Sequence, residues 1–156
     1  MGEMVNKIGR MVRMEENHAS SLSTSIDGLS NVVVREILRS VAHDSQKHAG
    51  LYTAILSLLE GSQQAIVEEE YNRIEAVLKK HIEVESQMTQ EVKQLLENGL
   101  DGRVKHLLIE IYEDEIRHHT LMMRLLEAVI KREAILEEDM WNMIWRDVPG
   151  HGTPIA

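Results

Sequence analysis

The stretch Asp114-Glu115-Ile116-Arg117-His118-His119 lies inside an apolar run from Val104 to Ile130 and decides how the chain folds. On a helix, Glu115 and His118 are three residues apart and point from one face. That face is also the apolar stripe of the run, which consists of Val104, Leu107, Leu108, Ile111, Leu121, Met122, Leu125 and Val129. A carboxylate and an imidazole at core positions are costly unless something pairs them, so other helices should bring matching groups to the same level.

Three other segments show the same arrangement, an apolar helical stripe interrupted by ionisable side chains. The interrupting residues are Glu15 and His18 in the first segment, Asp44, Ser45 and His48 in the second, and His81 and Glu85 in the third. The spacing predicts four amphipathic helices, each with a carboxylate and a histidine near mid-length on its inward face.

An internal repeat supports this interpretation. A shift of 70 positions takes Glu15 to Glu85, Asp44 to Asp114, Lys47 to Arg117 and His48 to His118. Four polar coincidences in one ungapped register predict a duplicated helical hairpin. The copies differ at three places: His18 corresponds to Met88, His81 to Met11, and Ser45 to Glu115.

Composition narrows the function classes. The 156 residues suffice for one domain, and the net charge of −9 without a basic block argues against nucleic acids and anionic membranes as partners. The chain has no cysteine, which excludes disulfides, thiolate catalysis and a cysteine-bound iron centre within it. No signal peptide or membrane span is visible, so we expect a cytoplasmic location.

Turn and cap residues set the expected boundaries of an all-α fold. We predict helices over residues 3–26, 32–59, 69–97 and 103–131, which form a ferritin-like four-helix bundle domain at 1–131. A short helix and an irregular tail follow at 132–156, after a kink or loop near 133–136. The link between the second and third helices is either a tight turn, which the helical look of 63–68 favours, or a crossover.

The short final helix carries both tryptophans, Trp141 and Trp145. It is either a flap that packs on the bundle or the contact of a homodimer, since clustered aromatic residues and Met favour interfaces.

Ionisable side chains that form a layer inside an apolar bundle need hydrogen-bonding partners or a bound cation. Carboxylates together with neutral imidazoles suit iron, manganese or zinc. A single core histidine is more often a packing residue, but the whole layer predicts a metal site. The candidate ligands are Glu15, His18, Asp44, His48, His81, Glu85, Glu115 and His118. Asp44 and Asp114 are alternatively groups that orient a histidine, and His43, His106 and His119 lie off the stripes, where we expect them to be exposed.

Two segments carry a family resemblance. Val41-Ala42-His43-Asp44-Ser45-Gln46-Lys47-His48-Ala49 resembles the second-helix motif of rubrerythrin-type di-iron bundles, within the ferritin-like superfamily, and residues 111–119 resemble the fourth-helix motif. Glu15 and Glu85 stand where that family carries single glutamates, and the resemblance covers about residues 3 to 131. It implies two bound irons, with Glu115 bridging them and His118 capping one.

The sequence departs from the family pattern in three ways. Ser45 occupies the place of the other bridging glutamate, so a single ion is an alternative to two. His18 and His81 add nitrogens that the pattern does not require. Without a cysteine-bound electron-transfer module, a redox-active centre would need an external electron donor.

The leading hypothesis is therefore a metal-dependent oxidoreductase or ferroxidase, in which bound Fe(II) reacts with peroxide or dioxygen. The second is a non-enzymatic metal-binding or sensing bundle, in which a histidine-rich site holds zinc or iron without turnover. The third is a helical interaction module whose polar layer only fixes register.

Overall fold

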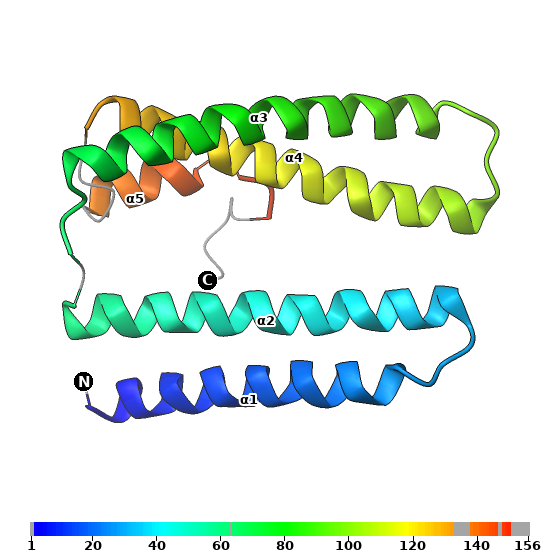
Figure 1. Ribbon diagram of the computed structural model, residues 1–156, viewed down its shortest axis with the longest axis horizontal. Helices are drawn as coiled ribbons and strands as arrows, with labels where there is room; N and C mark the ends of the chain where they lie inside the picture. The colour runs from blue at the N-terminus through cyan, green and yellow to red at the C-terminus, as the bar shows by residue number, and fades with distance from the viewer. Residues whose placement is uncertain (1, 63, 133–137, 147, 151–156) are drawn as a thin grey trace. The chain divides into compact units, whose positions relative to one another are not determined.

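The computed structural model describes residues 2–62, 64–132, 138–146 and 148–150, and the regular elements in these ranges are all helices. Four are long: α1 (Gly2–Ile26), α2 (Val32–Glu60), α3 (Glu68–Leu96) and α4 (Gly102–Ile130). The fifth, α5 (Glu138–Trp145), is short (Figure 1). The all-α prediction and the helix boundaries are confirmed to within one residue for the long helices. The expected kink near 133–136 lies outside the described residues.

The chain divides into two compact units, Met1–Gln64 and Ala65–Ala156. In the first unit α1 packs along α2, and in the second α3 packs along α4, which also carries α5 (Figure 1). Each unit is a helical hairpin of the predicted kind. The closure of the two hairpins into one four-helix bundle stays a prediction.

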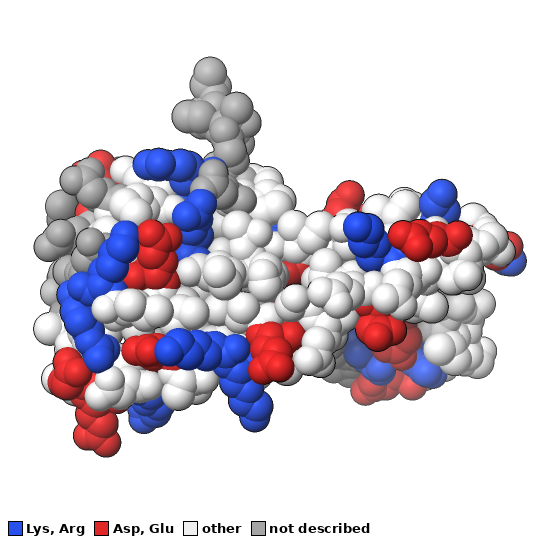
Figure 2. Space-filling view, turned by 90° about the horizontal axis from the view of Figure 1, so that it is seen from above, with Lys and Arg blue, Asp and Glu red and all other residues white. Residues whose placement is uncertain are grey.

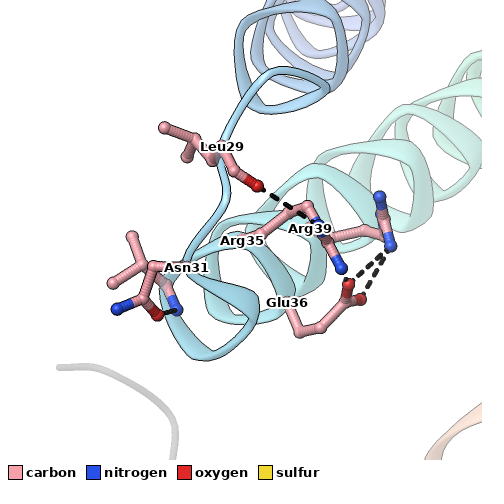
Figure 3. Close-up of polar contacts among 6 residues, drawn as sticks. Leu29, Asn31, Arg35, Glu36 and Arg39 are labelled. Carbon is pink, nitrogen blue, oxygen red and sulfur yellow. Dashed lines mark hydrogen bonds and ion pairs between the residues drawn. The ribbon is translucent and has the colours of Figure 1, made fainter.

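Local sequence signals explain where α2 begins and ends. The Asn31 side chain accepts a hydrogen bond from the Val34 amide at 3.1 Å, so it caps the helix as its residue type predicts. Beside this cap, Arg35 donates to the Leu29 carbonyl, and Glu36 accepts from Arg35 and Arg39 (Figure 3). At the other end, Gly61 adopts φ 63°, the left-handed conformation that ends many helices and favours glycine.

The start of α3 differs from the local expectation. Residues 64–67 are not helical, although their composition suggested a helix. Val67 is extended and has no side-chain acceptor for the exposed amides of the first turn. Only the reverse contact forms, in which the Val67 amide donates to Glu70 Oε2 at 3.1 Å. The helix therefore starts at Glu68, where three consecutive glutamates favour an N-terminus.

Small side chains form the seam of the first hairpin. Ala19, Ala42, Ser45 and Ala49 are all buried, with exposed fractions of 7% or less. Ile37 and Leu51 lie outside this seam and are 46% and 49% exposed. Two helices bury only the narrow stripe between them, and the rest of a wide apolar face needs another partner.

The second hairpin has such a partner over part of α4. Met140 and Ile144 of α5 pack against Ala128, and Leu121, Leu125, Met143 and Trp145 surround them. The rings of Trp141 and Trp145 lie 5.7 Å apart between centroids. The flap alternative is thus confirmed to the extent that α5 covers α4, and the tryptophan-mediated dimer stays a prediction.

Charged side chains are interspersed over the surface. Figure 2 shows acidic and basic residues side by side, separated by uncharged stretches, on the face in view. Several form exposed pairs one helical turn apart, such as Lys79 with Glu75 and Lys131 with Glu127. No described helix combines the length and the apolar character that crossing a membrane requires.

Candidate metal site

Three predicted ligands meet in the second hairpin. Glu85 comes from α3, and Glu115 and His118 come from adjacent turns of α4. One potential ligand atom from each lies within 4.8 Å of the others, and they are the only such cluster in the described part of the chain. The i,i+3 spacing on α4 places the carboxylate and the imidazole on one side, as the sequence predicted.

The two carboxylates of this cluster are in an unfavourable environment. Glu115 is only 9% exposed, and Glu85 is half-buried beside it. The Oε2 atoms of both are buried and have no hydrogen-bond partner among the described residues. Burial is the main reason that the pKa of Glu115 rises from 4.5 to about 7, and the neighbouring Glu85 raises it further. His118 opposes the shift, but more weakly.

The cluster is accessible from one side. His118 is exposed, and an open groove beside Glu115 is lined by Val84, Met88, Val92 and Ile111, together with polar residues of α3. An ion could therefore reach the carboxylates without unfolding the hairpin. Two adjacent carboxylates and an imidazole are a donor set that iron, manganese and zinc accept.

The first hairpin brings its own predicted ligands together in two pairs. His48 Nδ1 lies 3.5 Å from Glu15 Oε1, and His18 Nδ1 lies 3.0 Å from the Ser45 hydroxyl. Glu15 is half-buried, whereas His18 and His48 are exposed. Ser45, at the position equivalent to Glu115, occupies the buried seam with an uncharged group. This hairpin thus has one carboxylate where the second has two.

The remaining candidates lie at the surface. Asp44 pairs with Lys47 at 2.5 Å, and its repeat equivalent Asp114 pairs with Arg117. The pairing follows the i,i+3 spacing in both hairpins. His81 is exposed on α3 and lies outside the cluster of Glu85, Glu115 and His118.

His43 and His106 are exposed, as predicted, but the prediction for His119 was wrong. His119 is half-buried, and its Nδ1 atom is buried without a hydrogen-bond partner in the part of the chain that the structure describes. It lies on the side of α4 that lines a shallow groove with Tyr112, Thr120 and α3. The apolar stripe of α4 did not by itself indicate that this side of the helix also faces α3.

The hydrogen bond between His18 and Ser45 was not predicted from the sequence pattern either. In the sequence, Ser45 stands in place of a glutamate and His18 adds a nitrogen, and the structure joins the two side chains at 3.0 Å. The spacing of these residues contained the signal. In an antiparallel hairpin, three residues later on one helix lies beside three residues earlier on the other, so a contact between Glu15 and His48 implies one between His18 and Ser45.

Comparisons with models of known protein families, with curated proteins and with solved structures returned no match.

Proposed function

We propose that this chain is a metal-binding helical protein whose principal ligands are Glu85, Glu115 and His118. The observation that carries the proposal is the pair of buried carboxylate oxygens, one on Glu85 and one on Glu115, without a hydrogen-bond partner. Two adjacent carboxylates in a desolvated seam repel each other unless they share a proton or bind a cation. A divalent ion would supply the missing positive charge, and His118 would complete its nitrogen ligation.

The first hairpin supplies the second part of the proposal. Glu15, His18 and His48 would bind metal as the equivalents of the second set, with Asp44 and His81 as further candidates from the polar layer. Support comes from the repeat register, from the contact of Glu15 with His48, and from the ferritin-like resemblance. Because Ser45 replaces a carboxylate, we expect this set to bind more weakly.

Iron is the proposed metal, on the strength of the rubrerythrin-type resemblance, with manganese or zinc as alternatives. Bound Fe(II) would supply one-electron chemistry toward dioxygen or peroxide. The chain's own residues would hold the ion and neutralise its charge, and Val84, Met88 and Ile111 would line the open groove beside it. Electrons for repeated turnover would come from an external donor, since the sequence contains no cysteine.

The test is metal analysis of the protein after growth with added iron or zinc. Wild type should retain metal, and Glu115→Gln and His118→Ala should lose most of it. His106→Ala and Glu110→Gln are matched controls, because these residues lie on the same helix, form an exposed pair and stand apart from the cluster. Failure of the wild type to bind any metal, or equal loss in the control variants, would contradict the proposal.

Anaerobic loading with Fe(II) followed by air distinguishes an oxidoreductase from a binding protein. A new absorption band after air, absent from Glu115→Gln, would support redox chemistry at the cluster. An unchanged spectrum with retained iron would support binding alone.

A further inference from the structure

A groove of the second hairpin lies beside the seam of α3 and α4 and contains none of the proposed metal ligands. It has a volume of about 300 Å³, and its described lining residues all belong to these two helices. They are Ser86, Thr89, Gln90 and Lys93 of α3, and Tyr112, Ile116, His119 and Thr120 of α4. We call this set of residues the His119 groove. Its lining is formed within one hairpin.

The His119 groove has a half-buried floor and an exposed rim. Six of its side chains are half-buried, and only those of Gln90 and Lys93 are exposed. Most of the lining is polar, and Ile116 and the ring of Tyr112 supply its apolar part. A polar lining of this kind suits water or a polar ligand better than the apolar face of another helix.

Five of the lining side chains can donate hydrogen bonds but have no partner in the described part of the chain. They are Ser86, Gln90, Lys93, Tyr112 and His119. His119 is the clearest case, because its Nδ1 atom is also buried. The two threonines differ, since each hydroxyl donates to the carbonyl four residues earlier, at 2.7 Å for Thr89 and 2.8 Å for Thr120. A buried polar atom without a partner costs free energy that a bound ligand would recover.

The charge of the groove differs from that of the chain. The net charge of the protein is −9, yet the described lining has no carboxylate and one ammonium group, that of Lys93. Several other cations of this hairpin, such as Lys79 and Lys131, pair with a carboxylate one turn away. Lys93 has no such partner among the described residues. One positive charge among several hydrogen-bond donors favours an anion with a single negative charge.

A carboxylate fits this arrangement better than a phosphate. It carries one negative charge at neutral pH, which Lys93 alone can balance, and its two oxygens accept several hydrogen bonds. A phosphate group carries closer to two negative charges. Tyr112 and Ile116 also offer apolar surface to the carbon part of an organic acid, which inorganic phosphate lacks.

We propose that the His119 groove binds a small organic carboxylate. The donors of the lining bind the carboxylate oxygens, the ammonium group of Lys93 balances the charge at the rim, and the carbon chain lies against Tyr112 and Ile116. The site does not depend on the proposed function, because the lining includes no member of the metal cluster.

An NMR titration of the full-length, metal-free chain with butyrate tests the proposal. A chelator is present throughout, so that a carboxylate bound to a metal ion is not mistaken for one bound in the groove. The amide signals of the groove residues should shift and saturate, with a dissociation constant of about 1 mM. Butyramide has the same shape without the charge and should bind about 10-fold more weakly or less tightly still.

Two variants and a matched control assign the contacts. Lys93→Gln should weaken butyrate binding about 10-fold, because it removes the charge of the groove. Lys80→Gln makes the same change of charge at an exposed position of α3 outside the groove, and should leave binding unchanged. Tyr112→Phe keeps the ring and removes the hydroxyl, and should weaken binding about fivefold.

Four results would overturn the proposal: no saturable shift with butyrate, shifts centred on the first hairpin, equal weakening by Lys80→Gln, or equally tight binding of butyramide. Tighter binding of inorganic phosphate than of butyrate would overturn the carboxylate assignment. Amide spectra of Lys93→Gln and Tyr112→Phe that match wild type outside the groove would show that both variants fold. Metal retention by Lys93→Gln at the wild-type level would show that the groove and the metal cluster act separately.

Discussion

The two hairpins share a polar register but differ at one buried position. At that position the α1–α2 hairpin has Ser45, hydrogen-bonded to His18, and the α3–α4 hairpin has Glu115 beside Glu85. The serine places an uncharged, hydrogen-bonded group in its seam, whereas the glutamate leaves two neighbouring carboxylates, each with a buried oxygen, whose repulsion a cation can relieve. We expect this one side chain to decide whether a seam of small and polar residues is only structural or also binds a metal.

The hairpins differ a second time in what covers an apolar row, which is Leu121, Leu125 and Ala128 on α4 and the equivalent Leu51, Ile55 and Leu58 on α2. In the second hairpin, α5 covers the end of the row on α4, and Ala128 there is fully buried. In the first hairpin the equivalent Leu58 is 40% exposed. The row is thus partly covered within the second hairpin, whereas α1 leaves it uncovered within the first.

The largest expected effect concerns this covering helix. Ile144→Ala should destabilise the second hairpin by about 3 kcal/mol, because Ile144 is 2% exposed and its loss leaves a cavity against Ala128. Thermal unfolding monitored by tryptophan fluorescence would measure it. Ile130→Ala, at a 53% exposed position of α4, is the control and should have little effect. Equal effects of the two substitutions would show that α5 does not stabilise α4.

Exchanging Ser45 and Glu115 between the two hairpins should exchange the metal affinities of the hairpins. Glu115→Ser should weaken metal binding by the second hairpin by about 100-fold, since it removes a ligand rather than a supporting group. The reverse change, Ser45→Glu, should strengthen binding by the first hairpin, because Glu15 would then have a second carboxylate beside it. Calorimetric titration with Fe(II) or Zn(II) measures both. An unchanged metal affinity in Glu115→Ser would show that the cluster of Glu85, Glu115 and His118 does not bind the metal.

The pH dependence of stability should also differ between the hairpins. Burial raises the pKa of Glu115 to about 7, so between about pH 4.5 and 7 the folded state holds a proton that the unfolded state has released. The metal-free protein should therefore lose stability as pH rises through this window. Glu115→Gln should remove that loss and leave the protein more stable near pH 8, on the order of 2 kcal/mol. Urea unfolding at several pH values tests this, and a loss of equal size in Glu115→Gln would assign the titration elsewhere.

The smallest expected effects concern the helix starts. Asn31→Ala removes the side-chain cap of α2 and should cost about 1 kcal/mol. Val67→Ser should add the cap that α3 lacks and stabilise its hairpin by about 0.5 kcal/mol, because Val67 is already extended and exposed. Chemical denaturation of each variant measures the change. Destabilisation by Val67→Ser would indicate that Val67 packs more tightly than its exposure suggests.

Much of this structure could be predicted from local signals. Asn31, Gly61 and Asp101 cap or end helices as their residue types predict, and the period of the apolar residues indicated all four long helices. The i,i+3 spacing of Glu115 and His118 predicted that they share a side of α4, and the common polar layer predicted Glu85 as their neighbour. The surroundings of His119 could not be predicted in this way, because a helix contacts its neighbour over a width that an apolar stripe does not indicate.

The sequence by itself determined the helices, their pairing into hairpins through short turns, and the set of ionisable residues near the middle of each helix, because capping and periodicity act over a few residues. Only the tertiary structure decided which of these residues are buried together. Small residues such as Ala42 and Ala49 form the seam, which leaves the larger aliphatic residues outside it. Burial of Glu115 beside Glu85, and of α4 beneath α5, depends on contacts between segments distant in the chain, and no local pattern specifies such contacts.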